Sequence, residues 1–166
     1  KLPPVFGGGN MIANVTMEKS DWAEIPFKFE AGTPSIASVI GLGEAVEYFT
    51  NVHDEKSKAY LSELRNYLLR KLAQLPGIQL YPEINHQGDI NGPIIAFNIS
   101  DIHSYDISKL LSTKGICIRS GHHCALPILS TYGISSVNRI SLYYYNKKGE
   151  IDYFYDCIRE IIRILK

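Results

Sequence analysis

The sequence lacks an excess of either charge, and it lacks long apolar runs. Its 166 residues include 17 basic and 17 acidic side chains, so the formal net charge is zero. Proteins that bind nucleic acids or anionic membranes normally present a basic field, and a membrane-spanning helix needs about 20 consecutive apolar residues. We therefore expect neither a nucleic-acid partner nor a membrane attachment.

Cysteine is also scarce. Cys117, Cys124 and Cys157 are too few and too scattered for a disulfide framework, and their odd number is typical of a reducing compartment. The first residues contain neither an initiator methionine nor the apolar core of a signal peptide. The chain is long enough to bury a core without disulfides or metal ions. We expect an intracellular globular unit that is part of a larger protein.

The order of hydrophobic patterns predicts an α+β fold in which helices cover a small sheet. Residues 1–35 are rich in Gly and Pro, with one short strand-like run near Met11 to Met17, and we interpret them as an extended segment. Residues 36–166 are expected to form a small α/β domain. Helical spacing begins at Ile36, behind Ser35 as a plausible N-cap, and a second helix begins at about Asp54.

Strands and helices alternate in the rest of the chain. Strands are predicted at residues 78–81, 93–99, 116–119 and 139–143, and helices at residues 106–113, from Pro127, and over 151–165. Glycines and turn-forming polar residues predict a turn at residues 85–92. Three glycines at residues 7–9 lack the strand and helix context of a nucleotide-binding fingerprint, so we assign them no such role.

The densest reactive cluster is the run Arg-Ser-Gly-His-His-Cys-Ala at residues 119–125. A thiol reacts as its thiolate, which cationic and polar neighbours favour, and Gly121 permits a sharp turn that would place Cys124 on a loop. From the residues alone, a surface loop with an incidental cysteine is an equal alternative. A zinc site is a weaker one, because His122 and His123 are adjacent and no second cysteine lies at ligand spacing. We expect no metal.

Other candidates are weaker when they are taken singly. Cys117 lies in a predicted strand and Cys157 in the last predicted helix, so we expect both to be buried structural residues. Arg139 is either a solvated surface arginine or a bidentate clamp for a carboxylate. The Gly32-Thr33 pair ahead of a helix suits a phosphate, although such a segment is also an ordinary loop and cap.

Together these segments resemble the SufS-type (group II) cysteine desulfurases, which are class V aminotransferase-like enzymes of fold type I that use pyridoxal phosphate. The resemblance covers essentially the whole chain in the family's order. It rests on residues 3–12, on Lys-Phe-Glu-Ala-Gly-Thr-Pro at 28–34, on Ile-Gly-Leu-Gly at 40–43, and on residues 119–125.

The resemblance implies a role for each matching residue. Cys124 matches the nucleophile that receives sulfur from L-cysteine as a persulfide. Arg139 matches the arginine that binds the substrate carboxylate, and Arg119 matches an active-site arginine beside the persulfide loop. His123 flanks the nucleophile and is expected to favour its thiolate. Gly32 and Thr33 match the pair that reaches the cofactor phosphate of the other subunit in a homodimer.

The chain also departs from the family pattern. The Schiff-base lysine and the other ring-binding residues have no match here, so the resemblance implies a C-terminal part whose large cofactor domain is missing. Asn138 and Ile140 stand where small residues are usual, and we expect them to alter the pocket around Arg139. The loop from residue 83 to 92 is a few residues longer than usual.

The implied activity is a sulfurtransferase reaction that converts L-cysteine to L-alanine. The persulfide would pass to an acceptor protein of the SufE or SufU type for iron–sulfur cluster assembly, in a bacterial cytoplasm or in a plastid or other organelle. The alternatives are a selenocysteine lyase and a non-catalytic stand-alone domain that lacks the cofactor lysine. A Cys-His thiol hydrolase lacks a partner acid or amide at a persuasive spacing.

Overall fold

The computed structural model describes residues 2–81 and 92–166. The turn predicted at residues 85–92 and the longer loop expected from residue 83 lie outside the described residues, apart from Gly92. The chain forms two compact units, Lys1–His53 and Asp54–Lys166. This division differs from the boundary that we expected after residue 35.

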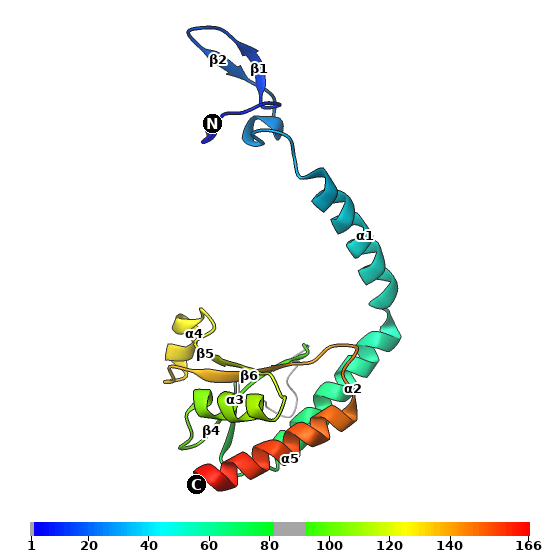
Figure 1. Ribbon diagram of the computed structural model, residues 1–166, viewed down its shortest axis with the longest axis vertical. Coiled ribbons are helices and arrows are strands. Elements are labelled where there is room, and N and C mark those ends of the chain that lie inside the picture. The colour runs from blue at the N-terminus through cyan, green and yellow to red at the C-terminus, as the bar shows by residue number, and fades with distance from the viewer. Residues whose placement is uncertain (1, 82–91) are drawn as a thin grey trace. The chain divides into compact units, whose positions relative to one another are not determined.

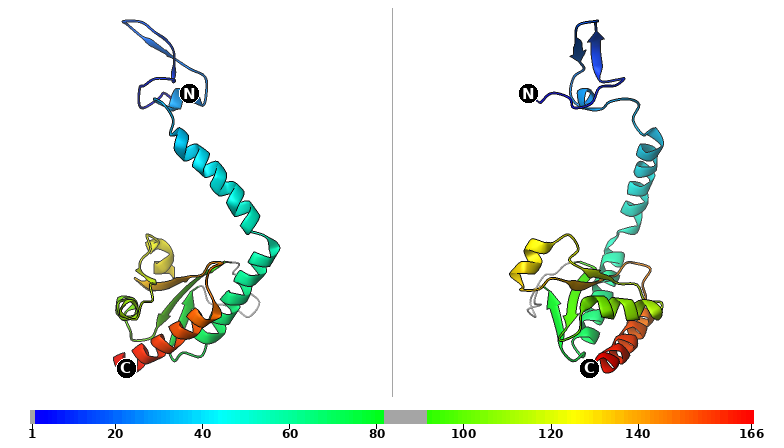
Figure 2. Two further views of the ribbon diagram at one scale, coloured as in Figure 1. Left: turned by 45° about the vertical axis from the view of Figure 1, so that its right-hand side comes forward. Right: turned by 60° about the vertical axis from the view of Figure 1, so that its left-hand side comes forward.

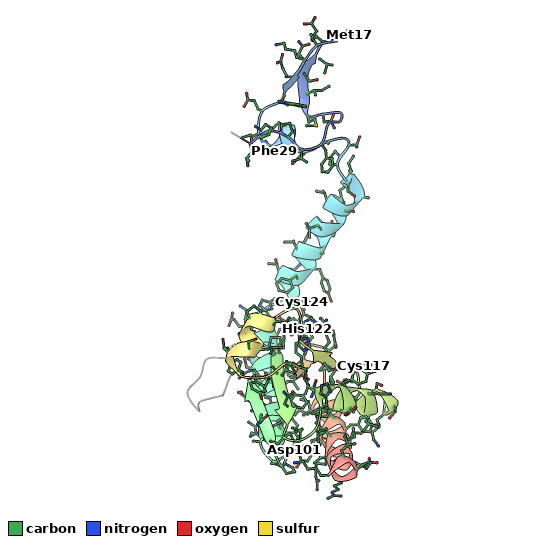
Figure 3. The ribbon with its side chains drawn as sticks, turned by 90° about the vertical axis from the view of Figure 1, so that its left-hand side faces the viewer. Met17, Phe29, Asp101, Cys117, His122 and Cys124 are labelled. Atoms are coloured by element: carbon green, nitrogen blue, oxygen red, sulfur yellow. The ribbon has the colours of Figure 1, made fainter. Side chains whose placement is uncertain are left out.

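The N-terminal unit begins with a hairpin of β1 (Ile12–Val15) and β2 (Ser20–Trp22), which pair antiparallel and place Met17 in the connecting turn (Figure 3). Thr16 closes the hairpin, because its backbone N–H donates to the carbonyl of Lys19 at 2.8 Å and its hydroxyl accepts from the backbone N–H of Lys19 at 3.1 Å. A short 3₁₀ helix, η1 (Phe27–Phe29), follows. We predicted only one strand-like run here.

Helix α1 (Ile36–Val52) confirms the helix predicted from Ile36, but none of its residues is buried. The N-cap residue is Ser35, as expected, yet its side chain makes no capping bond and its hydroxyl lies 2.8 Å from that of Ser38. Helix α1 belongs to the N-terminal unit.

The C-terminal unit confirms the predicted α+β fold (Figures 1 and 2). Its sheet has the order β3-β4-β6-β5, in which every neighbouring pair is antiparallel. The strands are β3 (Ile78–Tyr81), β4 (Ile94–Ile99), β5 (Arg119–Gly121) and β6 (Val137–Ser141). The helices are α2 (Glu55–Leu72), α3 (Ser104–Thr113), α4 (Leu126–Thr131) and α5 (Lys148–Leu165).

One face of the sheet carries the hydrophobic core. Helices α2, α3 and α5 lie on this side and α4 lies on the other (Figure 1). The core-facing strand residues include Ile95, Phe97, Ile99 and Ile140, and they pack with buried residues of the three helices, among them Leu68, Ile107, Leu111, Phe154 and Ile158. Full burial of each such side chain stabilises the fold by about 1.5–3 kcal/mol. We call this side the core face and the opposite side the open face.

Helix α2 begins with a side-chain N-cap. The carboxylate of Asp54 accepts from the backbone N–H of Ser57 at 2.8 Å, as an N-cap side chain does. That hydrogen bond holds the pKa of the Asp54 carboxyl below its ordinary value. The helix predicted from about Asp54 is confirmed.

The segment around Cys117 corrects two expectations. The strand predicted at residues 116–119 begins only at Arg119, and Cys117 is exposed rather than buried. Gly115, at φ 76°, turns the chain back after α3, and the backbone N–H of Ile116 donates to the carbonyl of Leu111 at 3.0 Å. This hydrogen bond holds the segment against the end of α3, so pairing with β6 starts only at Arg119. Cys157 is buried, as predicted.

Candidate active site

The open face of the sheet brings two predicted site residues together. In the antiparallel pairing of β5 with β6, Arg119 lies directly opposite Arg139, and the next strand places Ala96 opposite Arg139. Residues directly opposite in such a pair have Cβ atoms about 4.5–5.5 Å apart and share a face of the sheet. The two arginines are therefore neighbours, although 20 positions separate them in the sequence.

Two guanidinium groups on one face attract an anion. Like charges placed directly opposite destabilise a sheet, and an anion bound between them removes that penalty. The Nε atom of Arg139 is buried and has no hydrogen-bond partner within residues 2–81 and 92–166. Arginine binds carboxylates through paired, charge-assisted hydrogen bonds. The arrangement fits a carboxylate ligand on the open face.

Asn138 and Ile140, which we expected to alter the surroundings of Arg139, lie on the opposite face of the sheet from its side chain. Side chains alternate between the faces of a strand, so both residues lie on the core face when Arg139 lies on the open face. Asn138 is fully buried and Ile140 is part of the hydrophobic core. Neither side chain therefore lies beside the guanidinium group of Arg139 on the open face.

The loop that follows β5 presents Cys124 to solvent in a strained backbone conformation. Gly121 has φ 118°, and two residues without glycine's freedom, His123 and Cys124, have φ 52° and 57°. Non-glycine residues seldom adopt positive φ, and where they do the surrounding structure holds them there. Cys124 is exposed to solvent. The predicted placement of this cysteine on a Gly-flanked loop is confirmed.

The two histidines of the loop hold its backbone. Nδ1 of His122 accepts from the backbone N–H of Cys124 at 2.9 Å. Nε2 of His123 lies 3.0 Å from the backbone carbonyl of Val137, which can only accept, so this nitrogen carries the donated proton. His123 therefore ties the loop to β6. The sequence indicated His123 as a neighbour of the nucleophile. It did not indicate the hydrogen bond between His122 and the Cys124 backbone, because that bond depends on the conformation of the turn.

Cys117 lies apart from the site. In Figure 3 it is separated from Cys124 and His122 within the C-terminal unit. It borders a cavity of about 490 Å³ whose lining includes residues 115–118, residues 140–142 and the start of α5, but neither Arg119 nor Arg139.

Gly32 and Thr33 lie in the N-terminal unit, just before α1. Gly32 has φ 87°, and its backbone N–H donates to the carbonyl of Gly9 at 2.9 Å. Gly8 approaches the same segment so closely that a Cβ on it would lie 3.0 Å from the nitrogen of Gly32. The glycine run at residues 7–9 thus shapes the Gly32 turn, a role that sequence reasoning did not find.

Exposed groups at the start of α1 suit an anion. Thr33 is exposed, and Ser35 leaves the first-turn N–H groups of the 17-residue helix without a side-chain cap. Such N–H groups and the helix dipole favour a phosphate. In the part of the chain that the structure describes, no cluster of three or more His, Cys, Asp or Glu side chains could hold a metal ion. No helix there is long and apolar enough to cross a membrane.

Comparisons with known proteins agree on one family. The family model for aminotransferase class-V matches residues 1–154. A probable cysteine desulfurase of Synechocystis is 43% identical over 162 residues, which cover 98% of this chain and 38% of that protein. A cysteine desulfurase of Salmonella agona is 40% identical over 166 residues, which cover 99% of this chain and 40% of that protein.

Solved structures show the same likeness. The cysteine desulfurase CsdA from Escherichia coli superposes with a TM-score of 0.86 at 29% identity, over 99% of this chain and 40% of that one. A cysteine desulfurase from Thermococcus onnurineus superposes with a TM-score of 0.79 at 30% identity, over 98% of this chain and 40% of that one. The chain spans about two fifths of the length of the relatives that it matches.

Proposed function

This chain belongs to the aminotransferase class-V family, and we propose that it is the C-terminal part of a pyridoxal-phosphate-dependent cysteine desulfurase. The observation that carries the proposal is the exposed Cys124 on a strained loop. This loop directly follows β5, the strand in which Arg119 lies opposite Arg139 of β6. The similarity to proteins named cysteine desulfurase along nearly the whole chain supports it. The proposal includes the SufS-type subgroup, because residues 119–125 resemble the corresponding segment of that subgroup.

Cys124 is the proposed nucleophile. Its thiolate attacks the sulfur of bound L-cysteine, a new S–S bond forms on Cys124, and the Cβ–S bond of the substrate breaks. The electron pair of the broken bond stays with the substrate carbon, which takes up a proton and becomes the methyl group of L-alanine. The protein is left with a persulfide on Cys124.

Arg139 and Arg119 are the proposed carboxylate clamp. Two fixed guanidinium groups orient the substrate by its carboxylate, so that its sulfur is presented to the Cys124 loop. His123 is a positioning residue in this scheme, because its bond to the Val137 carbonyl joins that loop to the strand that carries Arg139.

Gly32 and Thr33 are proposed to hold the phosphate end of the cofactor. The exposed threonine and the uncapped start of α1 fit a phosphate group. Pyridoxal phosphate, when bound, supplies an electron sink that weakens the Cβ–S bond of the substrate. In this proposal, the lysine that carries the cofactor lies in the part of the protein that this chain does not span, and the phosphate would be that of the other subunit of a homodimer.

We further propose that the persulfide passes to an acceptor protein of the SufE or SufU type and from there to iron–sulfur cluster assembly. An exposed cysteine on a loop suits transfer to a second protein, because the sulfur must be reached by the thiol of the acceptor.

The test is an assay of the full-length protein, loaded with pyridoxal phosphate, for L-alanine formed from L-cysteine with a thiol reductant present. We expect alanine and sulfide in equal amounts, and no alanine from the Cys124→Ala variant. A wild-type protein that forms no alanine would support the non-catalytic alternative. Turnover of L-selenocysteine alone would identify a selenocysteine lyase instead.

A further inference from the structure

The core face of β6 contains a buried amide that the fold leaves without a partner. Asn138 has no exposed surface, and neither its Oδ1 nor its Nδ2 has a hydrogen-bond partner among the residues described. A buried polar group without a hydrogen bond costs free energy that an apolar side chain of similar size would not. Such a residue in a packed core requires an explanation.

The neighbours of Asn138 on the β5 side of this face are polar, whereas the apolar Phe97 of β4 lies opposite it on the other side. Ser120 of β5 lies directly opposite it, and the Oγ of Ser120 is 2.8 Å from the Oγ of Ser108 on α3. One turn earlier on the same helix, the hydroxyl of Ser104 donates to that of Ser136 at 2.9 Å, two residues before Asn138. We call these five residues the polar seam: Ser104, Ser108, Ser120, Ser136 and Asn138.

The hydroxyl pairs of the seam do not use all their hydrogen-bonding capacity. The Ser108 hydroxyl donates to the Tyr105 carbonyl at 2.9 Å, so Ser120 is the donor to Ser108, and the oxygens of this pair can still accept from a further donor. The amide of Asn138 offers two donors and one carbonyl acceptor. A water molecule that makes about three hydrogen bonds can join such groups, and buried waters in proteins do so commonly.

We propose that the polar seam binds an internal water held by the Asn138 amide and by the Ser108–Ser120 hydroxyl pair. The water would lock α3 to β5 and β6 at the pair Ser120–Asn138, which is adjacent in the ladder to the pair Arg119–Arg139. Asn138 is then a positioning residue for the arginines: it acts from the opposite face by fixing the register of the two strands. This last role rests on the function proposed above, whereas the water site does not.

The experiment uses the full-length protein and three variants. Asn138→Ala removes the amide, and Asn138→Ser keeps a hydroxyl that can hold the water. Ile140→Val is the matched control, because it removes one methylene from the same face of the same strand. The readouts are the electron density at the seam in a high-resolution crystal structure, amide hydrogen exchange at residues 119–121, and KM and kcat for L-cysteine.

We expect an ordered water within hydrogen-bonding distance of Asn138 in the wild type and in Asn138→Ser, and faster exchange at residues 119–121 in Asn138→Ala only. The KM of Asn138→Ala should rise about tenfold, less than the ~100-fold loss that a 1 Å misplacement can cause. Ile140→Val should leave KM unchanged.

A direct Asn138–Ser bond without a water would overturn the water site. An unchanged KM in Asn138→Ala, with an active wild type, would overturn the positioning role. An inactive wild type would count against the proposed function alone, because the density and the exchange rates do not depend on activity.

Discussion

Cys124 adopts a backbone conformation that only glycine takes without strain. For an L-residue with a Cβ atom the left-handed region costs roughly 1–2 kcal/mol. Cys124→Gly and Cys124→Ala both remove the thiol, but only the glycine relieves this cost. We therefore expect the glycine variant of the full-length protein to be more stable than the alanine variant by about 1 kcal/mol.

The measurement is the midpoint of thermal unfolding of the two variants under identical conditions. Both should fail to transfer sulfur, so the comparison isolates the backbone from the chemistry. An alanine variant as stable as the glycine variant would show that the loop is unstrained in solution.

The opposed arginines make a second prediction at the scale of single residues. Arg119→Gln removes one of two like charges that face each other, so the free protein should gain roughly 0.2–1 kcal/mol of stability. The same change removes half of the proposed carboxylate clamp, so KM for L-cysteine should rise. Thermal unfolding and steady-state kinetics of the full-length protein measure the two effects. A loss of stability together with an unchanged KM would contradict the assignment of Arg119.

The start of α5 gives a prediction of pH dependence at the scale of one element. The carboxylate of Glu150 accepts from the backbone N–H of Lys147 at 2.8 Å and from the Asn146 amide at 3.2 Å. The Lys147 bond first, and the Asn146 bond second, lower the pKa of Glu150 below its ordinary value of 4.5. Because the folded pKa is lowered, this group contributes stability above pH 4.5 and loses it as the pH falls through the folded pKa.

Glu150→Gln keeps an acceptor for the Lys147 N–H but does not titrate. The thermal unfolding midpoint of this variant should therefore fall less steeply than that of the wild type as the pH is lowered below 4.5. Glu47→Gln removes an exposed carboxylate of α1 and serves as the control for a change of charge alone. Parallel curves for wild type and Glu150→Gln would contradict a stabilising cap.

Periodic elements could be predicted from the sequence, and short or polar ones could not. The strand predicted at residues 78–81 matches β3, and the amphipathic pattern over residues 151–165 lies within α5 (Lys148–Leu165). The three-residue strand β2 (Ser20–Trp22) was missed, because three residues with two polar side chains show no usable alternation. The strand at residues 116–119 was displaced, because a turn after α3 delays its pairing.

The residue types of the site could be predicted, and their partners could not. Cys124, Arg119 and Arg139 stand out by their chemistry and motif. The direct opposition of the two arginines depends on the sheet order β3-β4-β6-β5, in which β5 pairs with a strand that follows α4. The placement of Asn138 on the core face likewise depends on register, so the sequence did not show that its side chain lies on the face opposite to Arg139.

At the scale of the whole molecule, the chain spans about two fifths of the relatives that it matches, and the proposed function assigns the cofactor lysine to the rest of the protein. We expect the 166-residue chain alone to bind pyridoxal phosphate poorly and to release no alanine from L-cysteine. Equilibrium dialysis followed by absorption spectroscopy measures the binding. Stoichiometric binding of the cofactor and formation of alanine by this chain alone would contradict the proposal that the cofactor lysine lies elsewhere in the protein.

The central claim is that Cys124 receives the sulfur, and mass spectrometry of the full-length protein after addition of L-cysteine tests it most directly. Cys117 and Cys157 are built-in controls: one is exposed outside any strand, and the other is buried in α5. The account predicts the added mass of one sulfur atom on the peptide that contains Cys124, and none on that peptide in Cys124→Ala. Sulfur found on Cys117 or Cys157 instead, or sulfur transfer by Cys124→Ala at the wild-type rate, would contradict it.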